Sequence, residues 1–265
     1  MQAGGGGGGH TGRVNGTVLD DHEVARLLAH EAGQLLLAVR SRTPEADLKA
    51  AGDAASHAHL MARLAELRPH DRVLSEETKA EDRTAAAGHG RVWIVDPLDG
   101  TREFGEPPRH DWAVHVALVV DGAPVLGAVA LPGRDLTLAT GGGLPRPAAA
   151  HDGPPRLLVS RTRPTEHAQA LAARLGADLV PLGSAGAKAM AVVLGEADIY
   201  AHSGGQYEWD SAAPVAVALA AGFHATRLDG SPLVYDRPDP WLPDLLVCRP
   251  DLAPAVLAAC AELAG

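Results

Sequence analysis

The sequence predicts an α+β half followed by an α/β half in one chain of 265 residues. Two segments with apolar residues at helical spacing come first, and five short apolar or β-branched segments follow them. After residue 156, strand and helix patterns alternate, which is typical of an α/β layer. The stretch 141–155 is rich in Gly, Pro and Ala and is the expected hinge between the halves 19–145 and 155–265.

The N-terminal half starts with two helices. Asp20 and Glu23 have the spacing of a capping box, and the first helix is expected to run from there to about Arg40. A second helix is expected from Asp53 to Leu67, before a proline at residue 69. The segments that follow predict a largely antiparallel sheet. They are Val73–Leu74, Arg91–Val95, Ala113–Val120, Val125–Leu131 and Leu136–Thr140.

The C-terminal half alternates between the two element types. Its expected strands are Arg156–Ser160, Asp178–Leu182, Ala197–His202 and Phe223–Leu228. Its expected helices are Thr165–Leu175, Ser184–Leu194 and Ser211–Ala221. A strand at Leu245–Cys248 and a helix from Ala253 close the half, and 229–243, with four prolines, is expected to be an ordered surface loop.

Residues 1–18 are expected to form a disordered tail. The six consecutive glycines from Gly4 to Gly9 cannot bury apolar surface. Gly4, Gly6 and Gly9 formally fit a GxGxxG dinucleotide fingerprint, but no strand precedes them, and we discard that interpretation.

Composition excludes several classes of partner. With 33 Asp and Glu against 23 Lys and Arg, the net charge of −10 argues against nucleic acid polymers and anionic membranes. No apolar run approaches the roughly 20 residues of a membrane span. Cys248 and Cys260 match no metal-binding spacing, so a reducing cytoplasm is the expected location. A phosphate-bearing partner would need a local positive site.

The end of the second predicted strand carries the strongest functional signal. The strand ends at Asp96, a proline bends the chain, and Asp99 follows at a turn or helix start. The two carboxylates and the Leu98 carbonyl could converge on hard cations, and the N–H groups around Gly100 and Thr101 could receive a phosphate. A role as helix cap would explain Asp99 but not Asp96.

Two further acidic segments extend this signal. Glu76 and Glu77 follow a predicted strand, and Asp210 precedes an apolar helix, where capping is the simpler interpretation. If Glu77, Asp96, Asp99 and Asp210 meet, each close pair costs on the order of 4 kcal/mol at an effective dielectric of about 20. Their convergence therefore requires divalent cations, and oxygen ligands favour Mg²⁺ or Mn²⁺ over zinc.

Three motifs in this order resemble the lithium-sensitive, magnesium-dependent phosphatases. That family includes inositol monophosphatases, fructose-1,6-bisphosphatases and 3′-phosphoadenosine-5′-phosphate phosphatases. The motifs are Leu74-Ser75-Glu76-Glu77, Asp96-Pro97-Leu98-Asp99-Gly100-Thr101 and Trp209-Asp210-Ser211-Ala212-Ala213, and Arg102-Glu103-Phe104 is most similar to the bacterial CysQ-type branch. The resemblance implies a layered αβαβα sandwich of the sugar-phosphatase type, with most metal ligands in 19–145, a site completed by 155–265, and a homodimer.

The resemblance also implies roles for individual residues. The metal ligands would be Glu77, Asp96, the Leu98 carbonyl, Asp99 and Asp210, and the catalytic residues Thr101, Asp53 and Glu77. The substrate-binding residues would be Asp99, Gly100, Thr101, Ser184, Lys188 and Asp210. Independently of the resemblance, Arg161 in Ser160-Arg161-Thr162-Arg163 follows a predicted strand and is a further candidate to bind a phosphate of the substrate. For Ser184 and Lys188, a helix cap and a surface charge are equally good interpretations.

The reaction implied is metal-assisted hydrolysis of a small phosphate monoester. Two or three Mg²⁺ ions, with Mn²⁺ as a substitute, would neutralise the acids and activate water. The expected reaction converts adenosine 3′,5′-bisphosphate, a by-product of sulfate assimilation, to AMP and phosphate. Inositol 1-phosphate and fructose 1,6-bisphosphate are alternative substrates, and a non-catalytic phosphonucleotide sensor is an alternative of another class. A haloacid-dehalogenase mechanism fits less well, because two residues and not one separate Asp96 from Asp99.

Overall fold

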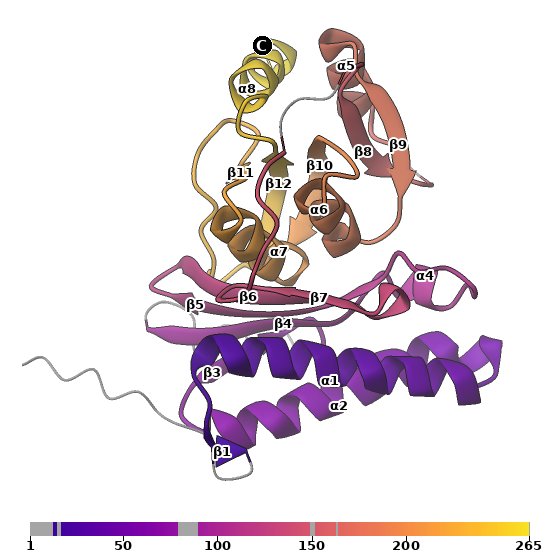
Figure 1. Cartoon of the computed structure of the whole chain (residues 1–265), viewed down its shortest axis with the longest axis vertical. Helices are drawn as coiled ribbons and strands as arrows, with labels where there is room; N and C mark the ends of the chain where they lie inside the picture. Colours follow the sequence, from indigo (N-terminus) through magenta and orange to yellow (C-terminus); the bar gives the residue numbers. More distant parts are fainter. Residues whose placement is uncertain (1–12, 15–16, 79–89, 149–151, 163, 265) are drawn as a thin grey trace, which may run out of the picture.

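The computed structural model describes residues 13–14, 17–78, 90–148, 152–162 and 164–264, and Figure 1 shows their arrangement. The glycine tract lies outside the described residues. The expected disorder of 1–18 does not hold for four of them, because Arg13–Val14 (β1) pairs antiparallel with Thr17–Val18 (β2). Asn-Gly separates the two strands in the sequence, a dipeptide that favours hairpin turns and that the composition argument overlooked.

The N-terminal half contains two long helices and a five-stranded sheet of order β3-β4-β5-β6-β7. Only β3 and β4 are parallel in this sheet, so the prediction of a largely antiparallel sheet is confirmed. Its elements are α1 (Asp21–Arg42), a 3₁₀ turn (Glu45–Asp47), α2 (Leu48–Leu67), β3 (Arg72–Ser75), β4 (Arg91–Asp99), α4 (Thr101–Phe104), β5 (Ala113–Val120), β6 (Ala123–Leu131), a second 3₁₀ turn (Pro132–Arg134) and β7 (Leu136–Ala139).

The C-terminal half has a second five-stranded sheet of order β11-β12-β10-β8-β9. Strands β8, β9 and β10 are parallel, as in an α/β layer, whereas β12 is antiparallel to both of its neighbours. Its elements are β8 (Arg156–Ser160), α5 (Glu166–Leu175), β9 (Asp178–Leu182), α6 (Ala185–Val193), β10 (Ile199–Tyr207), α7 (Glu208–Ala220), β11 (His224–Thr226), β12 (Trp241–Cys248) and α8 (Ala253–Ala264).

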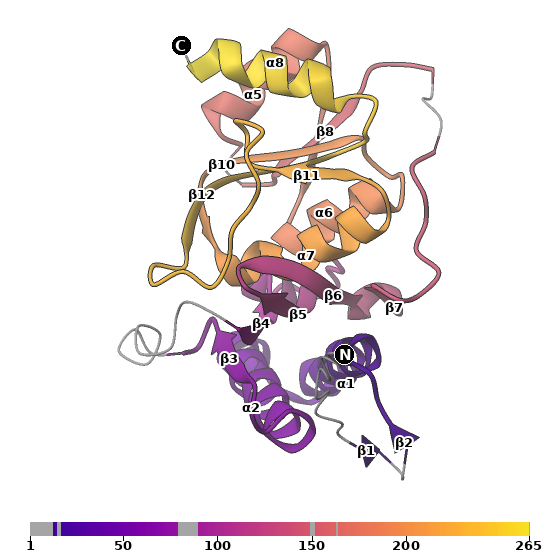
Figure 2. The ribbon, with the colours of Figure 1, turned by 90° about the vertical axis from the view of Figure 1, so that its left-hand side faces the viewer.

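The elements stack as the predicted αβαβα sandwich. Figures 1 and 2 show α1 and α2 on the outer face of the first sheet, α6 and α7 between the sheets, and α5 and α8 beyond the second sheet. Both faces of the first sheet are therefore buried. Along β4, Trp93 and Val95 face α1 and α2, whereas Val92 and Ile94 join the central core, which explains the continuous apolar run.

The central helical layer positions one part of the site. Gly127 on β6 packs directly against α7, and a Cβ added there would lie 2.9 Å from the backbone of Ala213. Only glycine permits this close approach, which holds the start of α7 near the end of β4. In the portion of the chain that the structure describes, no helix has the length and hydropathy to cross a membrane.

Several expected boundaries are wrong. Strand β4 runs to Asp99, which is its last residue and does not stand at a turn or helix start after a strand that ends at Asp96. Helix α2 begins at Leu48 and not at Asp53, because the good helix formers before Asp53 extend it toward the N-terminus. Strand β10 continues to Tyr207, so α7 begins at Glu208 and Asp210 is its third residue rather than its N-cap. Strand β12 starts at Trp241, which shortens the expected loop.

Candidate active site

Three aspartates that are far apart in the sequence converge between the two sheets. Asp96, Asp99 and Asp210 each offer a carboxylate oxygen, and these oxygens lie within 4.8 Å of one another. Asp96 and Asp99 stand at the end of β4, where the register with β5 shifts between them. This irregularity breaks the strict alternation of side chains, so two residues near one strand end contribute to one cluster. Asp210 joins them from the first turn of α7.

Burial and mutual repulsion perturb these acids. Burial, followed by the charges of Asp99 and Glu76, raises the pKa of Asp96 well above its usual value. Burial and the charge of Asp99 raise the pKa of Asp210 to about 6. Burial also raises the pKa of Asp99, but the charge and hydrogen bond of His115 and the donors on α6 outweigh it and bring the pKa to about 2. Asp99 therefore has the lowest pKa of the three aspartates.

The start of α6 holds the Asp99 carboxylate. The Gly186 N–H donates to Oδ2 at 2.6 Å and the Ala185 N–H to Oδ1 at 3.1 Å. Ser184 donates its hydroxyl to Oδ2, while its Oγ accepts the Ala187 N–H. Ser184 therefore caps α6 and contacts the acid cluster as well. The N-terminal end of a helix favours a negative charge, which stabilises this arrangement.

His115 is the buried titratable side chain that faces Asp99 from β5. Its Nε2 lies 3.2 Å from Asp99 Oδ2, and its Nδ1 donates to the Trp209 carbonyl at 2.9 Å. Burial lowers the pKa of His115, but the hydrogen bond and charge of Asp99 give a net increase. The imidazole thus links the end of β4 to the start of α7. The sequence signal was a single histidine inside the apolar strand Ala113–Val120, to which no role was assigned.

Thr101 and Asp53 form a second polar pair beside the cluster. Thr101 Oγ1 lies 3.1 Å from Asp53 Oδ1 and also 3.1 Å from the Leu98 carbonyl oxygen. Burial raises the pKa of Asp53 to about 6, although the hydrogen bond from Thr101 opposes the increase. The structure therefore brings these two predicted residues into contact across 48 positions of sequence.

The structure groups Glu76, rather than Glu77, with the aspartates. Glu76 is an exposed residue as a whole, but burial of its carboxylate and the charges of Asp210, Asp53 and Asp99 raise its pKa to about 7. The negative charge of Glu77 helps to raise the pKa values of Asp53 and Glu76. Adjacent residues at a strand end point in different directions, and sequence spacing alone did not decide which of the two faces the site.

A cavity of about 530 Å³ opens beside the cluster and is lined by Asp99, Gly100, Ser184, Lys188 and Asp210. The side chain of Lys188 is buried, donates to the Ser184 carbonyl at 2.7 Å and lies over the Tyr200 ring. Burial lowers its pKa, and the charges of Asp99, Glu103 and Asp210 oppose that change. Lys188 is therefore not a surface charge. The remaining lining residues are Ser160, Ala185, Tyr200, His202, Gly204, Gly205, Gln206, Tyr207 and Trp241.

Arg161, predicted to bind substrate, lies elsewhere. Its guanidinium pairs with Glu106 at 2.9 Å and with Glu103 at 3.4 Å, and it lines a separate cavity together with Arg109 and Arg134. Only its neighbour Ser160 reaches the cavity beside the aspartates. Two carboxylates thus hold the side chain that the prediction assigned to a phosphate.

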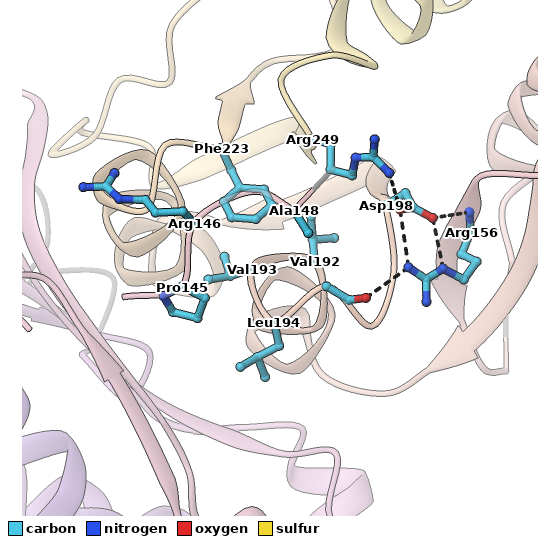
Figure 3. Close-up of a pocket in the computed structure, with 11 residues that line it drawn as sticks. Pro145, Arg146, Ala148, Arg156, Val192, Val193, Leu194, Asp198, Phe223 and Arg249 are labelled. Atoms are coloured by element: carbon cyan, nitrogen blue, oxygen red, sulfur yellow. Dashed lines mark hydrogen bonds and ion pairs between the residues drawn. The ribbon is translucent and has the colours of Figure 1, made fainter. Parts of the chain in front are cut away.

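A further cavity of about 380 Å³, shown in Figure 3, is rich in arginine but holds none of the clustered aspartates. Arg156 and Arg249 both bind the buried carboxylate of Asp198, and Arg146 donates to the carbonyl of Ala220. These interactions join β8, β10 and β12 at one end of the second sheet. The arginines therefore serve structural contacts, and the cavity lies apart from the acids.

The αβαβα sandwich and the carboxylate cluster between its sheets define a phosphatase of the sugar-phosphatase fold class. The chain belongs to the inositol monophosphatase family, whose model matches residues 15–261. The family is generally metal-dependent, and the cluster of Asp96, Asp99 and Asp210 provides a fitting set of ligands. The resemblance recognised in the sequence motifs is thereby confirmed.

Individual relatives narrow the comparison. A 3′-phosphoadenosine 5′-phosphate phosphatase of Mycobacterium tuberculosis is 49% identical over 245 residues, covering 88% of this chain and 90% of the relative. The 3′(2′),5′-bisphosphate nucleotidase CysQ of Escherichia coli is 31% identical over 225 residues, covering 78% of this chain and 91% of the relative. The crystal structure of CysQ from Bacteroides thetaiotaomicron, 27% identical, superposes with a TM-score of 0.71 over 85% of this chain and 96% of that one.

Proposed function

We propose that this phosphatase hydrolyses adenosine 3′,5′-bisphosphate to AMP and phosphate with Mg²⁺. The convergence of Asp96, Asp99 and Asp210 within 4.8 Å, beside a cavity with a buried lysine, is the observation that carries the reaction type. The substrate rests on the relatives at 47–49% identity, which are named as phosphatases of this compound. A cytoplasmic location and a homodimer belong to the same proposal.

Two or three Mg²⁺ ions, with Mn²⁺ as a substitute, would be held by Asp96, Asp99, Asp210, Glu76 and the Leu98 carbonyl. The donors are all oxygens, which suits hard divalent cations. Burial, followed by the charge of Asp99, raises the pKa values of Asp96 and Asp210, and a bound cation would offset both effects. A bound Mg²⁺ would supply Lewis-acid stabilisation of the phosphoryl oxygens and a lower pKa for a bound water.

The protein groups around the cluster orient the reactants. When Thr101 donates its hydroxyl proton to Asp53, its oxygen can accept a hydrogen bond from a water molecule and hold it for attack. Asp53, with a pKa of about 6, can then take up a proton near neutral pH. Lys188 lies in the cavity wall, where its ammonium would bind the substrate's anionic groups, whereas the Ser184 hydroxyl proton is already donated to Asp99.

Phosphate release with three substrates tests the function. Adenosine 3′,5′-bisphosphate, inositol 1-phosphate and fructose 1,6-bisphosphate are compared at saturating Mg²⁺, with and without a chelator. We expect the nucleotide to have the highest kcat/KM and the chelator to abolish turnover. If the nucleotide were the poorest of the three substrates, the proposed specificity would be wrong. Tight binding without turnover would favour a phosphonucleotide sensor.

A pair of matched variants tests the acid at the end of β3. Glu76→Gln is expected to raise the Mg²⁺ concentration for half-maximal activity at least tenfold, because it removes a charged oxygen ligand. Glu77→Gln makes the same chemical change one residue further on and is expected to alter that concentration less than threefold. The opposite ranking would restore Glu77 as the ligand.

A further inference from the structure

Gln206 is a buried polar residue to which the phosphatase reaction assigns no role. It lies on β10, it is 7% exposed as a whole, and it is one of the residues that line the cavity beside the aspartates. Within the described ranges, no hydrogen-bond partner reaches its amide nitrogen or its amide oxygen. Burying an amide without a partner is unfavourable, so a partner from outside the chain, such as a ligand or a water molecule, is expected to complete its hydrogen bonds.

The backbone before Gln206 is built irregularly. Gly204 and Gly205 both have positive φ angles, of 106° and 93°, and the pairing with β12 shifts register between Ser203 and Gln206. Such a bulge changes the direction in which the following side chain points. The His202 ring nitrogen Nε2 lies 2.8 Å from the Gly205 carbonyl and fixes the bulge. The strand thus departs from regular pairing just before the residue that lines the cavity.

Aromatic rings surround this end of the cavity. Tyr207 and Trp241, a cross-strand pair on β10 and β12, both line it and are 45% and 44% exposed. The Tyr207 ring stacks on Trp209 with centroids 4.8 Å apart, so it is held in place despite its exposure. Exposed planar rings that line the same cavity as an amide-bearing residue suit a planar ligand group that both stacks and forms hydrogen bonds.

We propose that Gln206 is a specificity-determining residue that recognises the nucleobase of the substrate. This inference rests on the proposed function, because only a nucleotide substrate carries a nucleobase. An amide presents one donor and one acceptor side by side, and adenine offers the complementary pair, its 6-amino group and an adjacent ring nitrogen. The Gln206 oxygen accepts from the amino group while its NH₂ donates to the ring nitrogen. The phosphate then lies toward Asp99 and Asp210, at the acidic part of the same cavity.

A substrate that lacks the amino group tests this assignment. We compare adenosine 3′,5′-bisphosphate with purine riboside 3′,5′-bisphosphate, which leaves the amide oxygen without a partner whichever way the amide is turned. The wild-type enzyme is expected to prefer adenosine in kcat/KM by about 10- to 100-fold. Gln206→Met, which has a similar shape but no amide, is expected to reduce that preference to less than threefold.

Thermal unfolding provides a second measurement that does not depend on turnover. Without ligand, Gln206→Met is expected to melt at the same temperature as the wild type or above it, because it removes an unpartnered buried amide. The stabilisation by AMP is expected to shrink in this variant. The control Gln34→Met, at an exposed position on α1, is expected to keep both the substrate preference and the AMP shift.

The outcomes separate the inference from the function it rests on. If the wild type hydrolyses neither bisphosphate, the proposed function fails and the inference with it. If it hydrolyses both equally well, or if Gln206→Met keeps the preference for adenosine, only the role of Gln206 is refuted. A lower melting temperature of the ligand-free Gln206→Met variant would show that the amide has a structural role instead, and would also refute it.

Discussion

Replacing Gly186 by alanine tests whether the α6 contact holds the metal-binding acids in place. A Cβ added at Gly186 would lie 2.0 Å from His115 Nε2 and 3.1 Å from Asp99 Oδ2. Ordinary contacts of this kind need about 3.5 Å, so the histidine or the helix must move by roughly 1.5 Å. Neither can move freely, because Gly186 itself donates to Asp99 and His115 is completely buried.

Two opposing terms set the effect of Gly186→Ala on stability. Overpacking a buried site costs about 1–3 kcal/mol, whereas alanine gains up to about 1 kcal/mol over glycine within a helix. The net expectation is a loss of about 0–2 kcal/mol in the free energy of unfolding, which leaves the protein folded. Activity should fall much further, because misplacing a catalytic group by about 1 Å costs on the order of 100-fold in rate.

The assay is kcat/KM for adenosine 3′,5′-bisphosphate at saturating Mg²⁺, together with thermal unfolding of the same samples. Gly143→Ala is the matched control, since a Cβ there would meet no atom within 4 Å. We expect the control to match the wild type and Gly186→Ala to lose about 100-fold in kcat/KM while its melting temperature falls by no more than about 8 °C. If Gly186→Ala kept its activity within twofold of the wild type, the contact between α6, Asp99 and His115 would not control the site.

Three other results follow from the same geometry. Thr101→Val should lower kcat by about 10²- to 10⁴-fold without unfolding the protein, because it removes the hydroxyl that contacts Asp53. Thr101→Ser keeps this hydroxyl and should retain most activity. An equal loss of kcat in both variants would contradict the role of the hydroxyl. The pKa values of Glu76 and Asp210 are raised to about 7 and about 6, so protons compete with Mg²⁺ for these carboxylates. The Mg²⁺ concentration for half-maximal activity should therefore rise as the pH falls from 7.5 to 5.5. A flat dependence would refute the assignment of Glu76 and Asp210 as metal ligands. Burial raises the pKa of Glu208 from 4.5 to about 7. Its contribution therefore favours the folded state below pH 4.5, and roughly 3 kcal/mol of that contribution is lost as the pH rises through 7. When denaturant unfolding is measured at pH 5 and pH 8, the free energy of unfolding should differ less between the two pH values for Glu208→Gln than for the wild type.

Local patterns predicted most of the architecture. The capping box at Asp20 and Glu23 is present at the start of α1, and β5, β8 and β9 have the predicted bounds. These features depend on residues within one turn of helix or one strand, where spacing and chain stereochemistry decide the outcome. The start of α7 was missed because the glycine bulge lets β10 continue past the expected end.

The sequence by itself determined which chemistry the chain carries. Asp96 and Asp99 stand at a strand end whose apolar residues require burial, and buried acids of that kind need cations, so their spacing already indicated the site. Only the tertiary structure brought the charges of Asp99 and Asp210 to bear on Glu76, paired Arg161 with Glu103 and Glu106, and placed Gln206 in the cavity wall. The reason is physical: a side chain's direction and its nearest charges depend on elements that meet in space from distant parts of the chain, and spacing along the chain does not contain that information.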